Sequence, residues 1–177
     1  MTTQRTTQGT TQETAGPVWT VVGSPIGELR LVAQDGSLRA VEFSPFEPID
    51  AGVEAGEQRD DDPVLVRTRD QLAAYFAGDL TTFDLPLAPR GTEFQQRVWA
   101  ELLHVGYGST ASYGQIAHRI GMTNVASRAV GLANGRNPIP VVIPCHRVIG
   151  ADGSLTGYAG GLDRKRLLLD LEQEGLF

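Results

Sequence analysis

Residues 112–134 read SYGQIAHRIGMTNVASRAVGLAN, and this stretch predicts two short helices joined by a tight turn. Ser112, followed three residues later by Gln115, forms a capping-box pattern that satisfies free backbone N–H groups at a helix start. Gly121 ends the first helix, and the second covers residues 125–134. Two short helices joined by a glycine-containing turn are typical of a helix-turn-helix.

The residues before this motif predict a small β-rich domain. Short runs with partly alternating apolar residues, separated by turn residues, predict an antiparallel meander, and a helical pattern follows them. The expected strands are residues 18–22, 27–33 and 37–43, and the expected helix is residues 64–77. The polar residues 1–16 predict a disordered tail, and the acidic residues 47–63 predict a mobile loop.

Helices dominate the second part of the chain. Thr92 and Gln95 form another capping-box pattern at the start of an apolar helical stripe. Residues 150–161 predict a β-turn or a wing, and residues 163–174 predict a last helix. We therefore expect an α+β fold with an N-terminal domain over residues 17–89. A helical C-terminal domain over residues 90–177 would carry the winged helix-turn-helix.

Charge and cysteine content limit the possible functions. The net charge is −6, but residues 112–177 hold 7 basic and 5 acidic residues, which permits contact with nucleic acid without implying it. The single cysteine excludes an intramolecular disulfide and a zinc site built on several thiolates. His104, His118 and His146 show no metal-ligand spacing, so we expect no metal.

Hydropathy gives no sign of a membrane or secretory protein. No apolar run approaches the roughly 20 residues that span a bilayer. The N-terminus has neither the basic start nor the apolar stretch of a signal peptide. A cytosolic location without membrane contact is therefore expected, and it suits a free thiol.

Residues 137–148, NPIPVVIPCHRV, carry the most chemical character. They contain three prolines, an apolar strand-like run at residues 141–143, and then a thiol beside an imidazole. A lone cysteine is most often a buried structural residue. Adjacency of Cys145 and His146 does not by itself show a reactive pair, since neighbours in sequence need not hydrogen-bond.

The wider pattern resembles the O6-alkylguanine-DNA alkyltransferase family over residues 90–172. The motifs that carry the resemblance are IPCHRV at residues 143–148, Asn137-Pro138, SRAVG at residues 127–131, GYAGG at residues 157–161 and Arg164-Lys165. The resemblance implies a ribonuclease H-like N-terminal domain. It also implies irreversible, stoichiometric transfer of an alkyl group from O6 of guanine in DNA to a cysteine.

Four residues would perform this chemistry if the resemblance holds. Cys145 would be the nucleophile, and His146 would act as its general base through a bridging water. Glu172 would orient His146 and stabilise its charge, by the logic of catalytic triads. Asn137 would brace the helix-turn-helix against the active-site strand. The S-alkyl cysteine has no route back to the thiol, so no cofactor is expected and each molecule would act once.

The same resemblance implies how double-stranded DNA would be held. The second helix of the helix-turn-helix would enter the minor groove, and the damaged base would be extruded into a pocket. Arg128 would fill the gap left by the flipped nucleotide. The small residues expected to allow close approach are Ala126, Ser127, Ala129 and Gly131, and the expected base pocket is formed by Tyr113, Val148, Tyr158 and Ala159. We expect a monomer in the absence of DNA.

Two alternatives compete with this interpretation. An alkyltransferase-like binding protein would flag damaged bases without reacting, but that class replaces the reactive cysteine, and Cys145 is present. A Cys-His hydrolase would regenerate its thiol after every cycle, and the block around Arg128 would then have no purpose.

Overall fold

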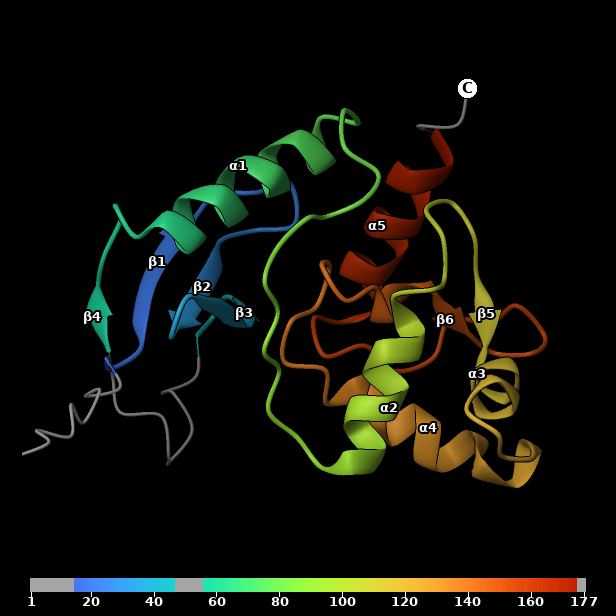
Figure 1. The fold of residues 1–177 in the computed structure, drawn as a ribbon. Helices are drawn as coiled ribbons and strands as arrows, with labels where there is room; N and C mark the ends of the chain where they lie inside the picture. The colour runs from blue at the N-terminus through green and yellow to red at the C-terminus, as the bar shows by residue number, and fades with distance from the viewer. Residues whose placement is uncertain (1–14, 47–55, 175–177) are drawn as a thin grey trace, which may run out of the picture.

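The chain folds into a small sheet domain and a helical domain that lie side by side (Figure 1). The structure is a computed structural model, and it describes residues 15–46 and 56–174. Residues 1–14 of the expected tail and residues 47–55 of the expected mobile loop lie outside these residues.

The N-terminal domain is a four-stranded sheet with the strand order β3-β2-β1-β4. β1 (Val18–Val22), β2 (Leu29–Gln34) and β3 (Ser37–Phe43) form the predicted antiparallel meander. β2 begins later than predicted because Gly27, at a φ of 101°, belongs to the preceding turn. The short β4 (Glu57–Gln58) pairs in parallel with β1, so the prediction of a loop throughout residues 47–63 is wrong at this point.

α1 (Pro63–Phe76) covers one face of this sheet (Figure 1). Its start is fixed locally, because the Asp62 side chain accepts hydrogen bonds from the backbone N–H groups of Val64 and Leu65. Leu72 and Tyr75 are buried on the inner face of the helix. The helix predicted over residues 64–77 is thus confirmed.

The linker after α1 extends the sheet before it reaches the second domain. Leu38 of β3 donates its N–H to the carbonyl of Pro86 at 2.8 Å, and Ala88 donates to the carbonyl of Leu38 at 2.9 Å. Residues 86–88 therefore run along the edge of β3, which fixes where the helical domain begins.

Both predicted capping boxes are present in the helical domain. Thr92 and Gln95 cap α2 (Glu93–Leu102), and Ser112 and Gln115 cap α3 (Tyr113–Arg119). A 3-10 turn, η1 (Asn124–Ala126), leads into α4 (Ser127–Gly135), which completes the helix-turn-helix. α5 (Leu162–Glu174) is the predicted last helix. No helix within residues 15–46 and 56–174 is long and apolar enough to cross a membrane.

A short parallel pair of strands lies beside the helix-turn-helix. β5 (Ala111–Ser112) pairs with β6 (Val148–Ile149), which follows the 3-10 turn η2 (Cys145–Arg147). Of the two interpretations for residues 150–161, the structure has the turn: Gly150 donates its N–H to the carbonyl of Ser154 at 2.8 Å.

The prediction of a strand-like run at residues 141–143 is wrong. Val141 has a φ of 72°, which is rare for a β-branched residue, and Ile143 donates its N–H back to the carbonyl of Ile139 at 2.9 Å. The segment is therefore a buried turn. The two hydrogen bonds of the Asn137 side chain, one donated and one accepted, hold the backbone in this shape.

Arg164 of α5 connects the two domains. Its Nε donates to the carbonyl of Ile26 at 2.7 Å, and its guanidinium also donates to the carbonyls of Ser44 and Gly160. The guanidinium carbon lies 5.1 Å from the centre of the Phe43 ring, within the range of a cation–π contact. A single planar side chain thus joins the sheet domain to the start of α5.

We expect Arg164→Lys to lower the free energy of unfolding by about 2 kcal/mol, because an ammonium cannot satisfy three carbonyls with the geometry of the guanidinium fork. Urea unfolding measures the change. Arg166→Lys is the matched control, because Arg166 is exposed on the same helix. Equal stability of the two variants would contradict the role of Arg164 as an interdomain clamp.

Candidate active site

The thiol of Cys145 lies at the point where the buried turn, α4 and α5 meet. Cys145 begins η2 and is 3% exposed, and its thiol is free. Asn134 of α4 donates its side-chain amide to the carbonyl of Cys145 at 3.3 Å. The backbone that carries the thiol is thereby tied to the second helix of the helix-turn-helix.

Asn137 shapes the turn that precedes the cysteine. Its Nδ2 donates to the carbonyl of Ile143 at 2.8 Å, and its Oδ1 accepts from the N–H of Ile139 at 3.0 Å. Asn137 lies between the end of α4 and this turn, where a brace was expected, although the braced segment is not a strand.

Burial and nearby polar groups act in opposite directions on the Cys145 thiol. Burial raises its pKa to about 11, while a hydrogen bond from the Asn137 side chain and the positive charge of Lys165 lower it. Lys165 is itself fully buried, and its Nζ donates to the carbonyls of Val148 and Thr156 at 2.6 and 2.9 Å. The resting group is therefore the thiol, which needs a base in order to react.

His146, which follows Cys145 in the chain, forms a fully buried pair with Glu172. The Nε2 of His146 lies 2.7 Å from Oε1 of Glu172, and both side chains are 0% exposed. Arg147 adds its guanidinium to the same carboxylate, through Nη2 at 2.8 Å from Oε1 and Nε at 2.9 Å from Oε2. The contact between His146 and Glu172 that the expected relay requires is thus present, and the relay itself stays a prediction.

Two further donors complete the surroundings of the Glu172 carboxylate. The hydroxyl of Tyr75 donates to Oε1 at 2.7 Å, and the N–H of Gly108 donates to Oε2 at 3.4 Å. An ionised carboxylate only accepts hydrogen bonds, and here donors from several elements approach both of its oxygens. Such an arrangement lets a charge stay buried without water.

The charges of this pair fix the tautomer of His146. Burial opposes ionisation of Glu172, but hydrogen bonds from His146 and Arg147 lower its pKa to about 2. Burial lowers the pKa of His146, although Glu172 works against that effect. At neutral pH the carboxylate is therefore charged and the imidazole neutral, so the proton lies on Nε2 and Nδ1 carries a lone pair. Nδ1 is buried and has no hydrogen-bond partner within the described chain.

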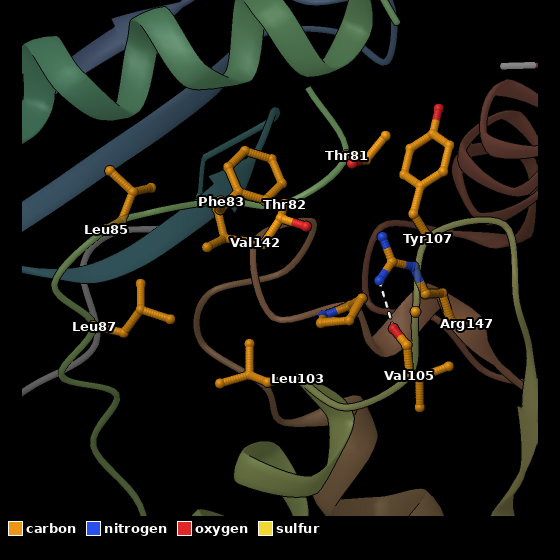
Figure 2. Close-up of a pocket in the computed structure, with 12 residues that line it drawn as sticks. Thr81, Thr82, Phe83, Leu85, Leu87, Leu103, Val105, Tyr107, Val142 and Arg147 are labelled. Atoms are coloured by element: carbon orange, nitrogen blue, oxygen red, sulfur yellow. Dashed lines mark hydrogen bonds between the residues drawn. The ribbon is translucent and has the colours of Figure 1, made fainter. Parts of the chain in front are cut away.

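Arg147, Lys165 and Tyr75 are the site residues that sequence reasoning missed. Arg147 and Lys165 stood in recognised motifs, but no role was assigned to them. Tyr75 gave no signal, because it lies in the other domain, 97 residues from Glu172. Figure 2 shows the guanidinium of Arg147 donating to the carbonyl of Val105, at a distance of 2.6 Å, beside the ring of Tyr107. Arg147, Val105 and Tyr107 line a cavity between the linker and the turn before Cys145.

The expected DNA-contacting residues gather around a groove between α4 and residues 156–159. Six of the residues expected to contact DNA or the flipped base line this groove: Tyr113, Ser127, Arg128, Gly131, Tyr158 and Ala159. Arg128 is exposed and makes no hydrogen bond or ion pair with the rest of the described residues. The Tyr113 hydroxyl donates to the carbonyl of Thr156 at 3.1 Å, which joins the two sides of the groove.

The remaining expected contact residues are placed differently. Ala129 is exposed on α4. Ala126 is buried in the core at 9% exposure, while the neighbouring Val125 is 92% exposed. Val148 is fully buried, and its carbonyl already accepts a hydrogen bond from Lys165.

Within residues 15–46 and 56–174, no cluster of His, Cys, Asp and Glu could hold a metal ion.

Comparison with known proteins assigns each half of the chain. Residues 18–89 match the family described as 6-O-methylguanine DNA methyltransferase, ribonuclease-like domain, and residues 93–174 match its DNA binding domain. A protein of Mycobacterium tuberculosis named methylated-DNA–protein-cysteine methyltransferase is 65% identical over 104 residues, which is 59% of this chain and 62% of that protein. This alignment thus spans less than two thirds of that relative.

Two other similar proteins are matched over more of their length. A protein of the same name from Mycolicibacterium paratuberculosis is 52% identical over 155 residues, covering 86% of this chain and 90% of that protein. The crystal structure of Mycobacterium tuberculosis OGT in complex with DNA has a TM-score of 0.80 and 49% identity, covering 89% of this chain and 94% of the other.

We expect Glu172→Gln to lower the free energy of unfolding by about 3 kcal/mol near neutral pH, because Arg147 would be left buried without a counter-charge. The folded-state pKa of Glu172 lies below its unfolded value. The stabilisation from its charge is therefore complete above about pH 5 and is lost as the pH falls toward 2. Urea unfolding of parent and variant across this range measures the difference, which should shrink toward acid pH. A difference that stays constant would contradict a charged Glu172 in the folded protein.

Proposed function

The chain belongs to the 6-O-methylguanine DNA methyltransferase family, and from this premise we propose that it repairs DNA by moving an alkyl group from O6 of guanine to Cys145. The observation that carries the proposal is the buried Cys145 thiol, followed directly in the chain by a neutral His146 that Glu172 holds in one tautomer. This arrangement supplies a nucleophile and a base in a site closed to bulk water.

The transfer follows from the protonation states of these groups. His146 takes the thiol proton on Nδ1, through a water that bridges the two side chains. The sulfur attacks the alkyl carbon, a carbon–sulfur bond forms, and the bond from that carbon to O6 breaks. The electron pair leaves on the guanine, which takes up a proton and is restored. The thioether that remains on Cys145 is a poor leaving group, so each molecule reacts once.

Charged and polar neighbours support the thiolate while it exists. The ammonium of Lys165 and the amide of Asn137 both lower the pKa of Cys145 against the effect of burial. A charge is more strongly stabilised by fixed neighbours in a dry site than in water.

Double-stranded DNA containing O6-alkylguanine is the proposed substrate, approached from the minor groove. The target oxygen is enclosed in a duplex, so the base must be extruded. The groove between α4 and residues 156–159 supports this role, because its small side chains allow the backbone of DNA to come close. Tyr113, Tyr158, Ala159 and the backbone near Val148 would then surround the base, while Arg128 fills the vacated stack.

Two other features remain proposals of the same kind. We place the protein in the cytosol, where a free thiol stays reduced, and we expect a monomer without DNA. A binding protein that only flags damage is the competing function, and the presence of Cys145 argues against it.

We expect one alkyl group per protein molecule when the protein is incubated with a duplex containing O6-methylguanine, because the thioether has no exit. Intact-protein and peptide mass spectrometry would show one added methylene mass, on the peptide that contains Cys145. Cys145→Ser is the control, and it should bind the duplex without reacting, because a hydroxyl is far less ionised than a thiol. Repair well beyond one equivalent would contradict the proposal. A Cys145 that stays unmodified would also contradict it, and would support the competing function of a protein that only flags damage.

Arg128→Ala should slow repair in duplex DNA strongly and should slow reaction with free O6-benzylguanine only weakly. Extrusion costs a few kcal/mol in a duplex, and the free base needs none. Arg128→Lys should also be impaired in the duplex, because lysine lacks the plane that stacks in the gap. Single-turnover rates on both substrates give the comparison within one protein. An equal loss on duplex and free base would mean that Arg128 does not act as a finger.

A further inference from the structure

One hydrogen-bond donor to the Glu172 carboxylate comes from the sheet domain, whereas Cys145, His146 and Glu172 all belong to the helical domain. Tyr75 is near the C-terminal end of α1, in the sheet domain, whereas Glu172 is near the end of α5 in the helical domain (Figure 1). The Tyr75 hydroxyl donates to Oε1 of Glu172 at 2.7 Å, and the same oxygen lies 2.7 Å from Nε2 of His146.

We infer that Tyr75 is a positioning residue for the transfer reaction: its hydroxyl fixes the Glu172 carboxylate toward His146, so the sheet domain completes the relay. The inference rests on the proposed function of Cys145, His146 and Glu172. It gives the N-terminal domain a part in the chemistry, in addition to its part in the fold.

The position of the Tyr75 hydroxyl is fixed by its surroundings. The side chain is fully buried, and its ring packs against Phe76, Phe83 and Tyr107 with centroid distances of 5.2, 5.3 and 6.2 Å. Burial raises the pKa of the hydroxyl, as does the neighbouring Glu172 charge, so the group stays protonated and acts as a donor. A rigid donor at this point holds the carboxylate in one orientation.

Loss of this hydroxyl would have a defined electrostatic effect. Oε1 would keep its hydrogen bonds from His146 and Arg147 but would lose the hydroxyl, a neutral donor that stabilises its negative charge. The carboxylate would then stabilise a protonated imidazole more strongly, which raises the pKa of His146. The base would be protonated over a wider acid range, so transfer would fail at a higher pH than in the parent protein.

Tyr75→Phe removes the hydroxyl and keeps the ring, and Tyr107→Phe is the matched control. The Tyr107 hydroxyl is also buried but has no hydrogen-bond partner among the described residues, and its ring packs on Tyr75. The assay is the single-turnover rate of transfer from free O6-benzylguanine to Cys145 as a function of pH, which needs no DNA binding.

We expect Tyr75→Phe to lower the rate about fivefold at neutral pH and to move the acid limb of the profile to higher pH, as loss of a hydrogen bond to a charged group predicts. Tyr107→Phe should stay within about twofold of the parent with an unmoved limb, since no hydrogen bond is lost. Circular dichroism at each pH gives the folded fraction, and the rate is expressed per folded molecule, so the midpoint of the limb decides the question even if Tyr75→Phe lowers stability.

A double-mutant cycle with Glu172→Gln separates positioning from packing. If Tyr75 acts through the carboxylate, adding Tyr75→Phe to Glu172→Gln should change the rate little. The same fivefold loss in both backgrounds, or a Tyr75→Phe profile identical to that of Tyr107→Phe, would overturn the inference. Failure of the parent protein to transfer any alkyl group would instead overturn the proposed function.

Discussion

The buried carboxylate of Glu172 is the group on which the rest of the site depends. Removing a charge from water is costly, and the cost is offset only where donors surround it completely. His146, Arg147, Tyr75 and Gly108 supply those donors from three different parts of the chain. The same hydrogen bonds that keep the carboxylate charged also fix His146 with Nδ1 free. Stability of the folded protein and the proposed activation of Cys145 thus share one set of contacts.

The arrangement of the two domains follows from this requirement. Arg164 ties the start of α5 to the sheet domain, and Tyr75 ties its end to the same domain. Between these points, Lys165 and Glu172 project from α5 toward the thiol and the imidazole. The helix-turn-helix is joined to the same centre through Asn134 and Cys145, so the helix that lines the groove proposed for DNA is tied to the backbone that carries the thiol.

Local patterns predicted much of this structure, and long-range contacts account for what they missed. Thr92 and Ser112 cap helices as predicted, because a capping box is complete within four residues. The run at residues 141–143 was expected to be extended, but hydrogen bonds from Asn137 make it a turn. Cys145, His146 and Glu172 were found through a family pattern, and the structure places His146 against Glu172. Tyr75 could not be found in this way, because its partner lies in another domain.

The tautomer of His146 tests the central claim most directly, since both the chemistry and the role of Glu172 depend on it. Nitrogen-15 NMR of the imidazole distinguishes a protonated ring nitrogen from one that carries a lone pair. The account predicts that, at neutral pH and without substrate, Nε2 of His146 carries the proton and Nδ1 does not. A proton on Nδ1, or a doubly protonated ring, would contradict it.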